Sequence, residues 1–446
     1  MARLESRYSE AGIDQAVSRL LRSLGVCWGD LIAPGDRVLL KPNFIRESHT
    51  RRPGEWEQII THGTVIGAVA TQIAAAMGGT GTITIADAPQ TDSDFERICE
   101  RAGLRQLQER IHHQFPGLVL EVLDLRREVW QTRNGVVVER RRLPEDPRGY
   151  TKVNLGRKSC FHGVAGRFYG ADYDTGLTAA HHTGEIHEYL LSRTAMDADL
   201  FINLPKLKTH KKVGVTLSLK NLVGINGDKN FLPHFRVGTP DEGGDEFPES
   251  NAKNKLQSRT ISLFKEVARR TGPAARFWAP LAKRAGSRIF GDSAQAVRSG
   301  NWYGNDTTWR MTLDLNKALF HFDGEGRPRT KKLKYLSIVD GVIAGEGDGP
   351  MEADPKECGL MIAGANPVAV DYVATALMGF DWLKVPSVRE AFCLAELLLT
   401  DFSPEDIEIV PEMGKPFRFQ PHFGWVGHIE SSAPRDVFEG TRLTVA

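Results

Sequence analysis

The sequence has few cysteines, and none of them form a group. Its 446 residues include only five cysteines, and no two of them have the CxxC spacing of a metal-binding pair: Cys27, Cys99, Cys160, Cys358 and Cys393. Iron–sulfur clusters and zinc ribbons are held by such grouped cysteines. We therefore expect no iron–sulfur cluster in this chain and reduced thiols typical of the cytosol.

Long apolar runs and a strong excess of one charge are also absent. The longest apolar runs are shorter than the roughly 18 residues that a membrane-spanning helix requires. The first 25 residues are charged and lack the apolar centre of a secretory signal. We expect a cytoplasmic protein. The formal net charge of +1 argues against nucleic acid as a partner, and the sequence does not indicate an oligomeric state.

Strand-like and helix-like segments alternate along the chain. Residues 36–45 and 80–90 have the pattern of buried strands, and 61–79 between them has helical spacing and ends in paired glycines. This order predicts a βαβ unit. The expected fold is α/β, with a Rossmann-like, mostly parallel sheet and helices on both faces.

The same alternation continues further along the chain. Residues 198–208 read as a strand, and 333–345 read as a strand that enters a glycine-rich loop. Residues 359–379 predict a strand, an Asn-Pro turn and a helix. A hairpin or an excursion of the chain is expected near residue 140, whereas 213–224 fits a strand or a helix equally well.

One segment is strongly basic. Residues 251–290 hold ten Lys or Arg and one Glu, a local charge of +9, so the rest of a chain that totals +1 carries −8. Its amphipathic pieces place Phe264, Phe277, Trp278 and Phe290 among the cations. Such a segment suits an anionic membrane surface or a solvated helix packed on its own protein.

We divide the chain into one α/β domain (1–250 with 301–430), a basic insertion (251–300) and a C-terminal tail (431–446).

Polar residues follow several of the predicted strands. Ligands bind at the carboxyl ends of strands in an open α/β sheet, and the residues found there are Lys41, Asn43, Asp87, Lys206, Lys208, His210, Asp340, Glu346 and Asp348. A cleft lined in this way suits an anion held by lysines and a divalent cation held by carboxylates.

The stretch 204–221 carries five lysines and one histidine. If this stretch is extended, alternate side chains point the same way, namely those of Lys206, Lys208 and His210. Such a row can contact a phosphate, a carboxylate or a nucleotide. The alternative is a surface strand whose lysines extend into solvent. We expect Lys211 and Lys212 to be solvated. His210 and His62 are the leading candidates for proton transfer; further histidines occur at 181, 182, 187 and 234.

The glycine loop 345–350 presents Glu346 and Asp348 where backbone can approach a ligand closely. With Asp340 and Asp87, these carboxylates are the predicted ligands of Mg²⁺ or Mn²⁺; the alternative is an acidic surface turn. The loop is neither a dinucleotide-binding nor a phosphate-loop fingerprint.

Several stretches together resemble the domain of unknown function 362 family. They lie between about residues 36 and 380, and the most specific is DADLFINLPKLKTHKKVGVTLSLKNLVG (197–224). Matching the blocks residue by residue adds Lys220, Asn221 and Asp371 to the candidate residues. Many family members carry a ferredoxin-like cysteine module, which this chain lacks. Residues 302–319 resemble a subgroup associated with polysaccharide or natural-product metabolism.

Two functions of different classes follow. In the first, the chain is an enzyme acting on an anionic small molecule, a sugar phosphate or nucleotide-linked intermediate. Lys41, Asn43, Lys206, Lys208, Lys220 and Asn221 then bind the substrate, and His210 or His62 moves a proton. In the second, the chain is a non-catalytic protein that docks on a membrane through 251–290, or on a partner such as a redox protein. The sequence assigns no reaction class.

Overall fold

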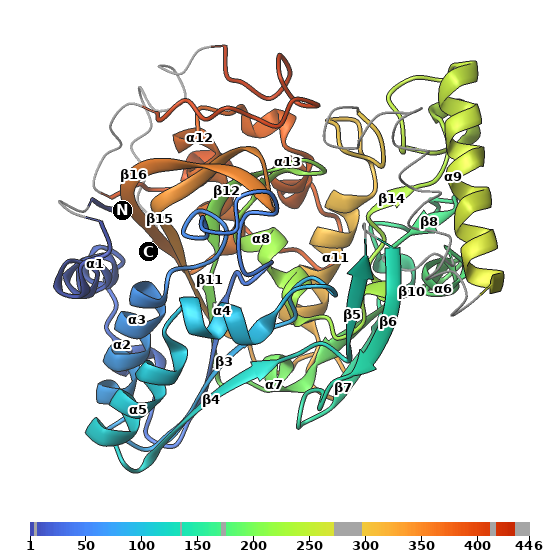
Figure 1. The fold of residues 1–446 in the computed structure, drawn as a ribbon. Helices are drawn as coiled ribbons and strands as arrows, with labels where there is room; N and C mark the ends of the chain where they lie inside the picture. Colours follow the sequence, from blue (N-terminus) through green and yellow to red (C-terminus); the bar gives the residue numbers. More distant parts are fainter. Residues whose placement is uncertain (4–6, 134–135, 171–174, 272–296, 411–415, 433–446) are drawn as a thin grey trace.

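The computed structural model describes residues 1–3, 7–133, 136–170, 175–271, 297–410 and 416–432. Its centre is a mixed sheet (Figure 1) with five parallel strands in the order β4 (Leu118–Asp124), β3 (Gly81–Asp87), β2 (Arg37–Pro42), β11 (Leu200–Leu204) and β15 (Lys334–Asp348). The antiparallel strands β16 (Glu352–Gly364) and β1 (Ala2–Arg3) extend it at the β15 edge. The predicted α/β class and mostly parallel sheet are confirmed.

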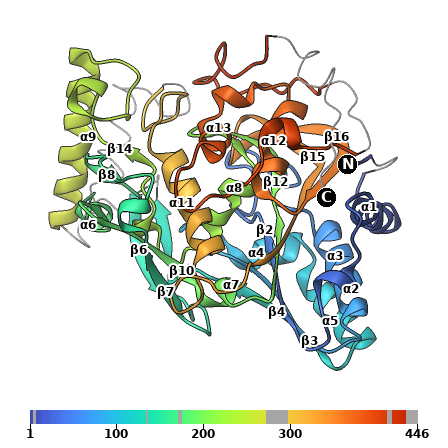
Figure 2. The same ribbon diagram turned by 180° about the vertical axis from the view of Figure 1, so that it is seen from behind.

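Helices cover both faces of the sheet, as expected. Val38 and Leu40 of β2 pack toward one side with α1 (Glu10–Ser23), α3 (Gly63–Ala76) and α5 (Leu104–Gln114). Leu39 between them packs toward the other side with α11 (Thr308–His321), because successive strand residues point to opposite faces. Figure 2 shows α11 and α12 (Pro367–Leu377) on this second side. Both faces are buried, which accounts for the nearly continuous apolar run of β2.

The segment after β11 continues along the same neighbour strand. Pro205 interrupts the ladder because it has no N–H, but its carbonyl accepts a hydrogen bond from Asp340 N at 2.9 Å. Beyond it, β12 (Lys206–His210) pairs in parallel with the second half of β15 and antiparallel with β13 (Gly214–Thr216). β12 therefore extends past the carboxyl end of β11, and this projection carries the lysines of the central stretch.

Two sequence-based expectations need revision here. The segment 213–224 is neither one strand nor one helix, because β13 is followed by the short helix α8 (Ser218–Asn221). The glycine-rich stretch 345–350 is largely not a loop, since β15 runs on to Asp348 and pairs with β16 along its length. By contrast, the hairpin near residue 140 is confirmed as β5 (Glu128–Arg133) and β6 (Val136–Arg142), and Asn366 caps α12 at the predicted Asn-Pro turn.

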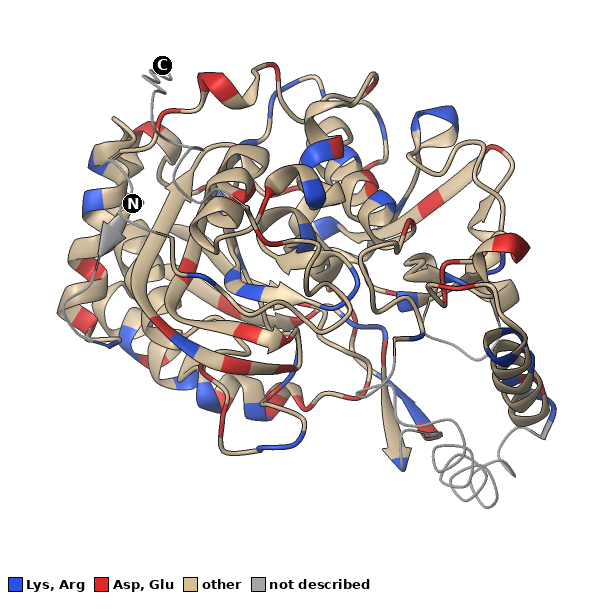
Figure 3. Ribbon diagram, turned by 90° about the horizontal axis from the view of Figure 1, so that it is seen from above, with Lys and Arg blue, Asp and Glu red and all other residues tan. Residues whose placement is uncertain are grey.

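A smaller region of short strands lies beside the main sheet (Figure 1). It contains β7 (Tyr150–Asn154), β10 (Ile186–Ser192) and β9 (His182–Thr183) in one sheet, and β8 (Phe168–Tyr169) paired with β14 (Phe235–Arg236). The basic segment begins next to it as α9 (Ala252–Thr271), which carries lysines and arginines along its length (Figure 3). Phe264 is half-buried, whereas Phe277, Trp278 and Phe290 lie outside the described residues, as does 433–446 of the predicted tail. No helix in the described ranges is long and apolar enough to cross a bilayer.

Candidate functional site

Two buried lysine–aspartate pairs close the carboxyl ends of the parallel strands. Lys41 at the end of β2 lies 2.9 Å from Asp87 at the end of β3, and Lys206 on β12 lies 2.8 Å from Asp340 on β15. Lys41, Lys206 and Asp340 have no exposed surface. A buried ammonium requires such a partner. These four predicted residues therefore lie at the expected sheet edge, but each lysine already has an internal counter-charge.

The second pair extends into a small network that includes His62. Tyr8 accepts a hydrogen bond from Lys206 Nζ at 2.7 Å and donates one to Asp340 at 2.8 Å. His62 donates its backbone N–H to the same carboxylate at 2.9 Å, and its ring Nδ1 accepts from Thr64 N as the N-cap of α3. The ring stacks on Tyr8 at 3.6 Å, and burial lowers its pKa to about 4. These contacts give His62 a structural role.

Lys208 is buried without a carboxylate partner among the described residues. Its ammonium donates to Asn43 Oδ1 at 2.7 Å and to the Ile59 carbonyl at 2.5 Å. Burial, and then the charge of Lys206, hold the pKa of Lys208 well below its usual range. From Asn43 a chain of side-chain amides continues through Asn221 to Asn203, at 2.8 and 2.7 Å. Asn43 and Asn221, predicted as substrate ligands, thus tie β2 and β11 to α8.

The short helix α8 is held by Asp371 and carries Lys220. Asp371 of α12 accepts hydrogen bonds from the backbone N–H groups of Ser218 and Leu219 at 2.7 and 2.9 Å. Lys220 is 8% exposed, and in the described part of the chain its ammonium has no hydrogen bond or ion pair. Solvent also reaches Lys220 Nζ, because it is not one of the fully enclosed, unpaired side-chain atoms in the described ranges. Lys220 therefore presents an unpaired, nearly buried cation that solvent still reaches.

Several basic side chains surround Lys220. Burial, and then Lys229, lower the pKa of Lys220 to about 7. Lys220 in turn depresses the pKa values of His210, His234 and Lys212, which places each of these three groups within electrostatic range of Lys220. We call Lys212, Lys220, Lys229, His210 and His234 the basic cluster. Its members come from the end of β12 and the turn after it, from α8 and from the segment of short turns that follows α8.

The two histidines of the cluster differ in tautomer. His210 Nδ1 accepts a hydrogen bond from Lys212 N at 3.0 Å, which leaves the proton on Nε2 of the neutral ring. His234 Nδ1 lies 2.8 Å from the Leu232 carbonyl, an acceptor, so that nitrogen carries the proton and Nε2 has a free lone pair. Burial and then the charge of Lys220 keep both pKa values well below 6.5. At neutral pH both rings are uncharged, so His210 Nε2–H can donate a hydrogen bond and His234 Nε2 can accept one.

The four carboxylates predicted to bind a metal do not gather in one place. Asp87 and Asp340 are paired with lysines, and Glu346 contacts Lys356 at 2.7 Å on the other side of the hairpin. Asp348 is nearly half exposed and lies 3.9 Å from His422 Nε2. Within the described ranges, no group of three or more His, Cys, Asp or Glu is arranged to hold a metal ion. Neither Glu346 nor Asp348 has an ion pair there with the lysines of β12.

Sequence reasoning missed part of the cluster. Lys212, expected to be solvated, is half-buried; its ammonium donates to the Ser299 carbonyl, and burial lowers its pKa to about 7. Lys229 donates to the Ala88 carbonyl at 2.7 Å, and burial lowers its pKa to about 8. Lys229 and His234 lie within a stretch of irregular, partly apolar sequence at 225–237. Their position within 14 residues of Lys220 was the available signal, and of the two only His234 had been noted from the sequence, as one of several histidines.

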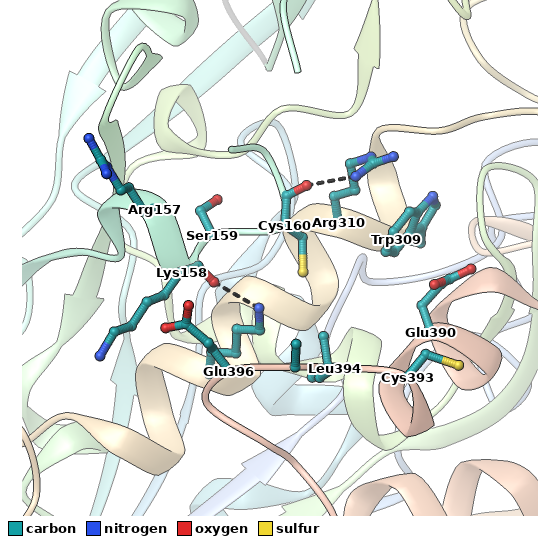
Figure 4. A pocket seen from close by; sticks show the side chains of 12 residues that line it. Arg157, Lys158, Ser159, Cys160, Trp309, Arg310, Glu390, Cys393, Leu394 and Glu396 are labelled. Atoms are coloured by element: carbon teal, nitrogen blue, oxygen red, sulfur yellow. Dashed lines mark hydrogen bonds between the residues drawn. The ribbon is translucent and has the colours of Figure 1, made fainter. Parts of the chain in front are cut away.

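A separate cavity of about 250 Å³ lies between α11 and the η1 turn (Gly156–Lys158), as Figure 4 shows. None of the residues predicted from sequence line it. Arg310 closes one wall by donating to the Cys160 carbonyl at 2.7 Å, and Lys317 donates to the Lys158 carbonyl at 2.8 Å. Burial, and then Asp314, raise the pKa of the Cys160 thiol, so it is protonated at neutral pH. Cys160 is therefore not an activated thiol.

The comparisons with solved structures reveal only distant similarity. A crystal structure of a Thermotoga maritima protein matches with a TM-score of 0.31 and 11% identity, over 78% of this chain and 53% of that one. The lactate racemase apoprotein from Thermoanaerobacterium thermosaccharolyticum matches with a TM-score of 0.31 and 12% identity, over 82% of this chain and 54% of that one. The chain thus spans about half the length of these two proteins.

The sequence comparisons are more specific. A thylakoid-associated protein of Synechocystis sp. is 26% identical over 387 residues, which cover 86% of this chain and 76% of the relative. The family model described as "Domain of unknown function (DUF362)" matches residues 116–376, which include β12, α8, the basic cluster and Asp371. The chain therefore belongs to the DUF362 family.

Proposed function

We propose that the chain is an enzyme that binds an anionic small molecule at the basic cluster. The observation that carries this proposal is Lys220, whose nearly buried ammonium has no partner among the described residues. A charged group in such a place is destabilising unless it is paired. A phosphate or carboxylate supplies the missing partner through charge-assisted hydrogen bonds.

The surrounding groups support the same function. Lys212 and Lys229 add positive charge around Lys220, and the neutral His210 offers an N–H donor. His234, with its free Nε2, can accept a hydrogen bond from a hydroxyl or amine group of a bound molecule. Lys41 and Lys206 hold the sheet edge through their aspartates and have no direct contact with the substrate in this proposal. The proposed function also includes two expectations from the sequence: a cytoplasmic location, and a sugar phosphate or nucleotide-linked compound as the substrate.

Replacing Lys220 with methionine is expected to weaken anion binding by about one to two orders of magnitude. The estimate follows because a hydrogen bond to a charged group contributes roughly 1.5–3 kcal/mol. Titration calorimetry with sulfate, inorganic phosphate and a sugar phosphate measures it. The same titration with added Mg²⁺ or Mn²⁺ tests the predicted metal. Lys152→Met, at a lysine of β7 whose side chain is 52% exposed, is the matched control and should bind like the unchanged protein.

The pH dependence of sulfate binding distinguishes Lys220 from other cations. Sulfate keeps its charge from pH 6 to 8, whereas an amine with a pKa of about 7 loses its proton over this range. Binding that requires protonated Lys220 should be about tenfold weaker at pH 8 than at pH 6. Lys212 and Lys229 titrate nearby, with pKa values of about 7 and about 8, so Lys220→Met should flatten only part of this slope. Equal affinity in Lys220→Met and the unchanged protein would refute the proposed site.

A second candidate function, docking on an anionic membrane, is supported by α9. Leu256 and Leu263, two turns apart on this helix, are 61% and 64% exposed and lie among basic residues such as Lys253 and Arg259. An exposed apolar stripe flanked by cations fits a lipid surface. The similar protein of Synechocystis sp. is named for its association with the thylakoid.

Replacing both leucines with glutamate is expected to abolish binding to vesicles that contain one third phosphatidylserine. The substitution removes apolar contact and adds repulsion from the anionic lipid. Co-sedimentation at low salt measures the effect, and binding of the unchanged protein should weaken as salt screens the attraction. Sulfate binding at the basic cluster should not change. Failure of the unchanged protein to bind such vesicles at low salt would refute docking.

A further inference from the structure

We infer that Lys220 is a nucleophile that forms an imine with the carbonyl group of an anionic oxo compound, so that the substrate carries both a C=O group and a carboxylate or phosphate. This inference rests on the proposed anion site and narrows its substrate. The observation behind it is that Lys220 Nζ is unpaired yet reaches solvent, with a hydrogen-bond donor (His210 Nε2–H) and a hydrogen-bond acceptor (His234 Nε2) in the same cluster.

The cluster has the properties of an activated amine site. An amine must be neutral to attack a carbonyl, and lysines become neutral near pH 7 when they are desolvated or lie beside other cations. Lys220 meets both conditions. It is only 8% exposed, and it lies near the cation Lys229; burial first, and then this charge, lower its pKa to about 7. Burial also lowers the pKa of Lys208, but its terminal nitrogen is fully enclosed and donates to Asn43 and to the Ile59 carbonyl. Lys220 alone combines a low pKa with a free nitrogen in the described cluster.

The step can be written with its atoms in balance. The neutral Lys220 nitrogen forms a bond to the carbonyl carbon, and the C=O π bond breaks toward oxygen. One N–H proton of the attacking nitrogen passes to the developing oxyanion; His234 Nε2 orients this N–H as a hydrogen-bond acceptor, and His210 Nε2–H donates a hydrogen bond to the oxyanion. The oxygen takes a second proton from solvent and leaves as water, which gives a protonated imine: amine plus carbonyl plus one proton yields iminium plus water. Lys229 and Lys212 hold the anionic group meanwhile.

The imine then determines what the enzyme can do. A protonated imine withdraws electrons from the neighbouring carbon, so a proton, a carboxylate or a carbon fragment can leave that carbon. 2-Oxo acids and the open-chain aldehyde forms of sugar phosphates share the required chemistry. The first has its anion next to the carbonyl, whereas the second has it several bonds away.

Reductive trapping tests the inference. The full chain is incubated at pH 7 with glyoxylate, with glyceraldehyde 3-phosphate or with neutral propionaldehyde, each together with sodium cyanoborohydride, and modified lysines are mapped by mass spectrometry. We expect Lys220 to be modified at least tenfold faster than any other lysine by one of the two anionic probes. The reactive probe distinguishes a 2-oxo acid from a sugar phosphate. Sulfate should compete.

Lys212 is an internal control, because its pKa is also about 7 while its nitrogen donates to the Ser299 carbonyl. It should stay unmodified. Lys220→Arg keeps the positive charge but removes the nucleophile, so it should retain sulfate binding within a few fold and show no label at this position. A normal melting transition confirms that the variant is folded.

The outcomes separate the two proposals. Sulfate binding that depends on Lys220, together with trapping no faster than at surface lysines, would overturn the imine and leave the anion site standing. Rapid modification of Lys220 by propionaldehyde, with no competition by sulfate, would overturn the anion site and the anionic substrate with it. Selective, sulfate-sensitive trapping at Lys220 supports both.

Discussion

Replacing Lys206 with methionine is expected to lower the free energy of unfolding by about 3–5 kcal/mol, the usual cost of removing one partner of a buried ion pair. Lys206 and Asp340 are 2.8 Å apart, and neither side chain has exposed surface. Without the ammonium, the carboxylate keeps three donors, Tyr8 Oη, His62 N and Val342 N, but loses its counter-charge. Urea unfolding at pH 7, followed by circular dichroism, measures the change.

The pH dependence and a double variant isolate the cause. In Lys206→Met the buried Asp340 should have a raised pKa, because burial disfavours its charged form. A carboxyl group with a raised folded pKa destabilises the fold as pH rises, so the deficit should shrink at pH 5. Adding Asp340→Asn removes the uncompensated charge and should recover part of the loss, with a coupling energy above about 1 kcal/mol. A single-variant loss below about 1 kcal/mol would show that the pair does not hold the sheet edge.

The sheet and its polar edge could be predicted from the sequence for a simple physical reason. Strands buried on both faces are apolar almost throughout, as in β2, so a lysine or aspartate marks the strand end. This rule predicts that Lys41 and Asp87 lie at the ends of their strands, and the parallel pairing of β2 with β3 brings the two side chains together. The rule does not state which charges pair. That depends on neighbours distant in sequence: Asp340 meets Lys206 because β12 continues along β15 beyond Pro205.

The basic cluster was harder to foresee because it is built from irregular backbone. Lys220 could be singled out by family resemblance, and His210 by its place after a strand. Lys229 and His234, however, lie in a segment of short turns, where no period places a side chain. Glu346 shows the opposite error. Its glycine-rich surroundings indicated a ligand loop, but the cross-strand ladder with β16 carries its side chain to Lys356.

Asp371 is the residue for which we expect a large effect on both stability and binding without contact to the anion. Its carboxylate accepts the backbone N–H groups of Ser218 and Leu219, at 2.7 and 2.9 Å, and is 2% exposed. Asp371→Ala leaves both donors buried and unpaired, at about 1–3 kcal/mol each, so the free energy of unfolding should fall by roughly 2–6 kcal/mol. Asp381→Ala, at a more exposed aspartate that accepts from Leu383 N at 3.0 Å, is the matched control and should cost about 1 kcal/mol.

The same substitution should weaken sulfate binding several fold, because Asp371 fixes the first turn of the helix that carries Lys220. Asp371→Asn keeps one acceptor oxygen and should fall between the alanine variant and the unchanged protein in both measurements. Asp371→Asn also removes a carboxyl group that titrates. Burial raises the pKa of Asp371 from 3.8 to about 7, so the folded state retains a proton that the unfolded chain releases, and this group lowers stability as pH rises from about 4 to about 7. Urea unfolding across that range should therefore show a flatter pH profile for Asp371→Asn. An alanine variant that binds sulfate as tightly as the unchanged protein, with a stability loss below about 1 kcal/mol, would show that α8 holds Lys220 in place without this carboxylate.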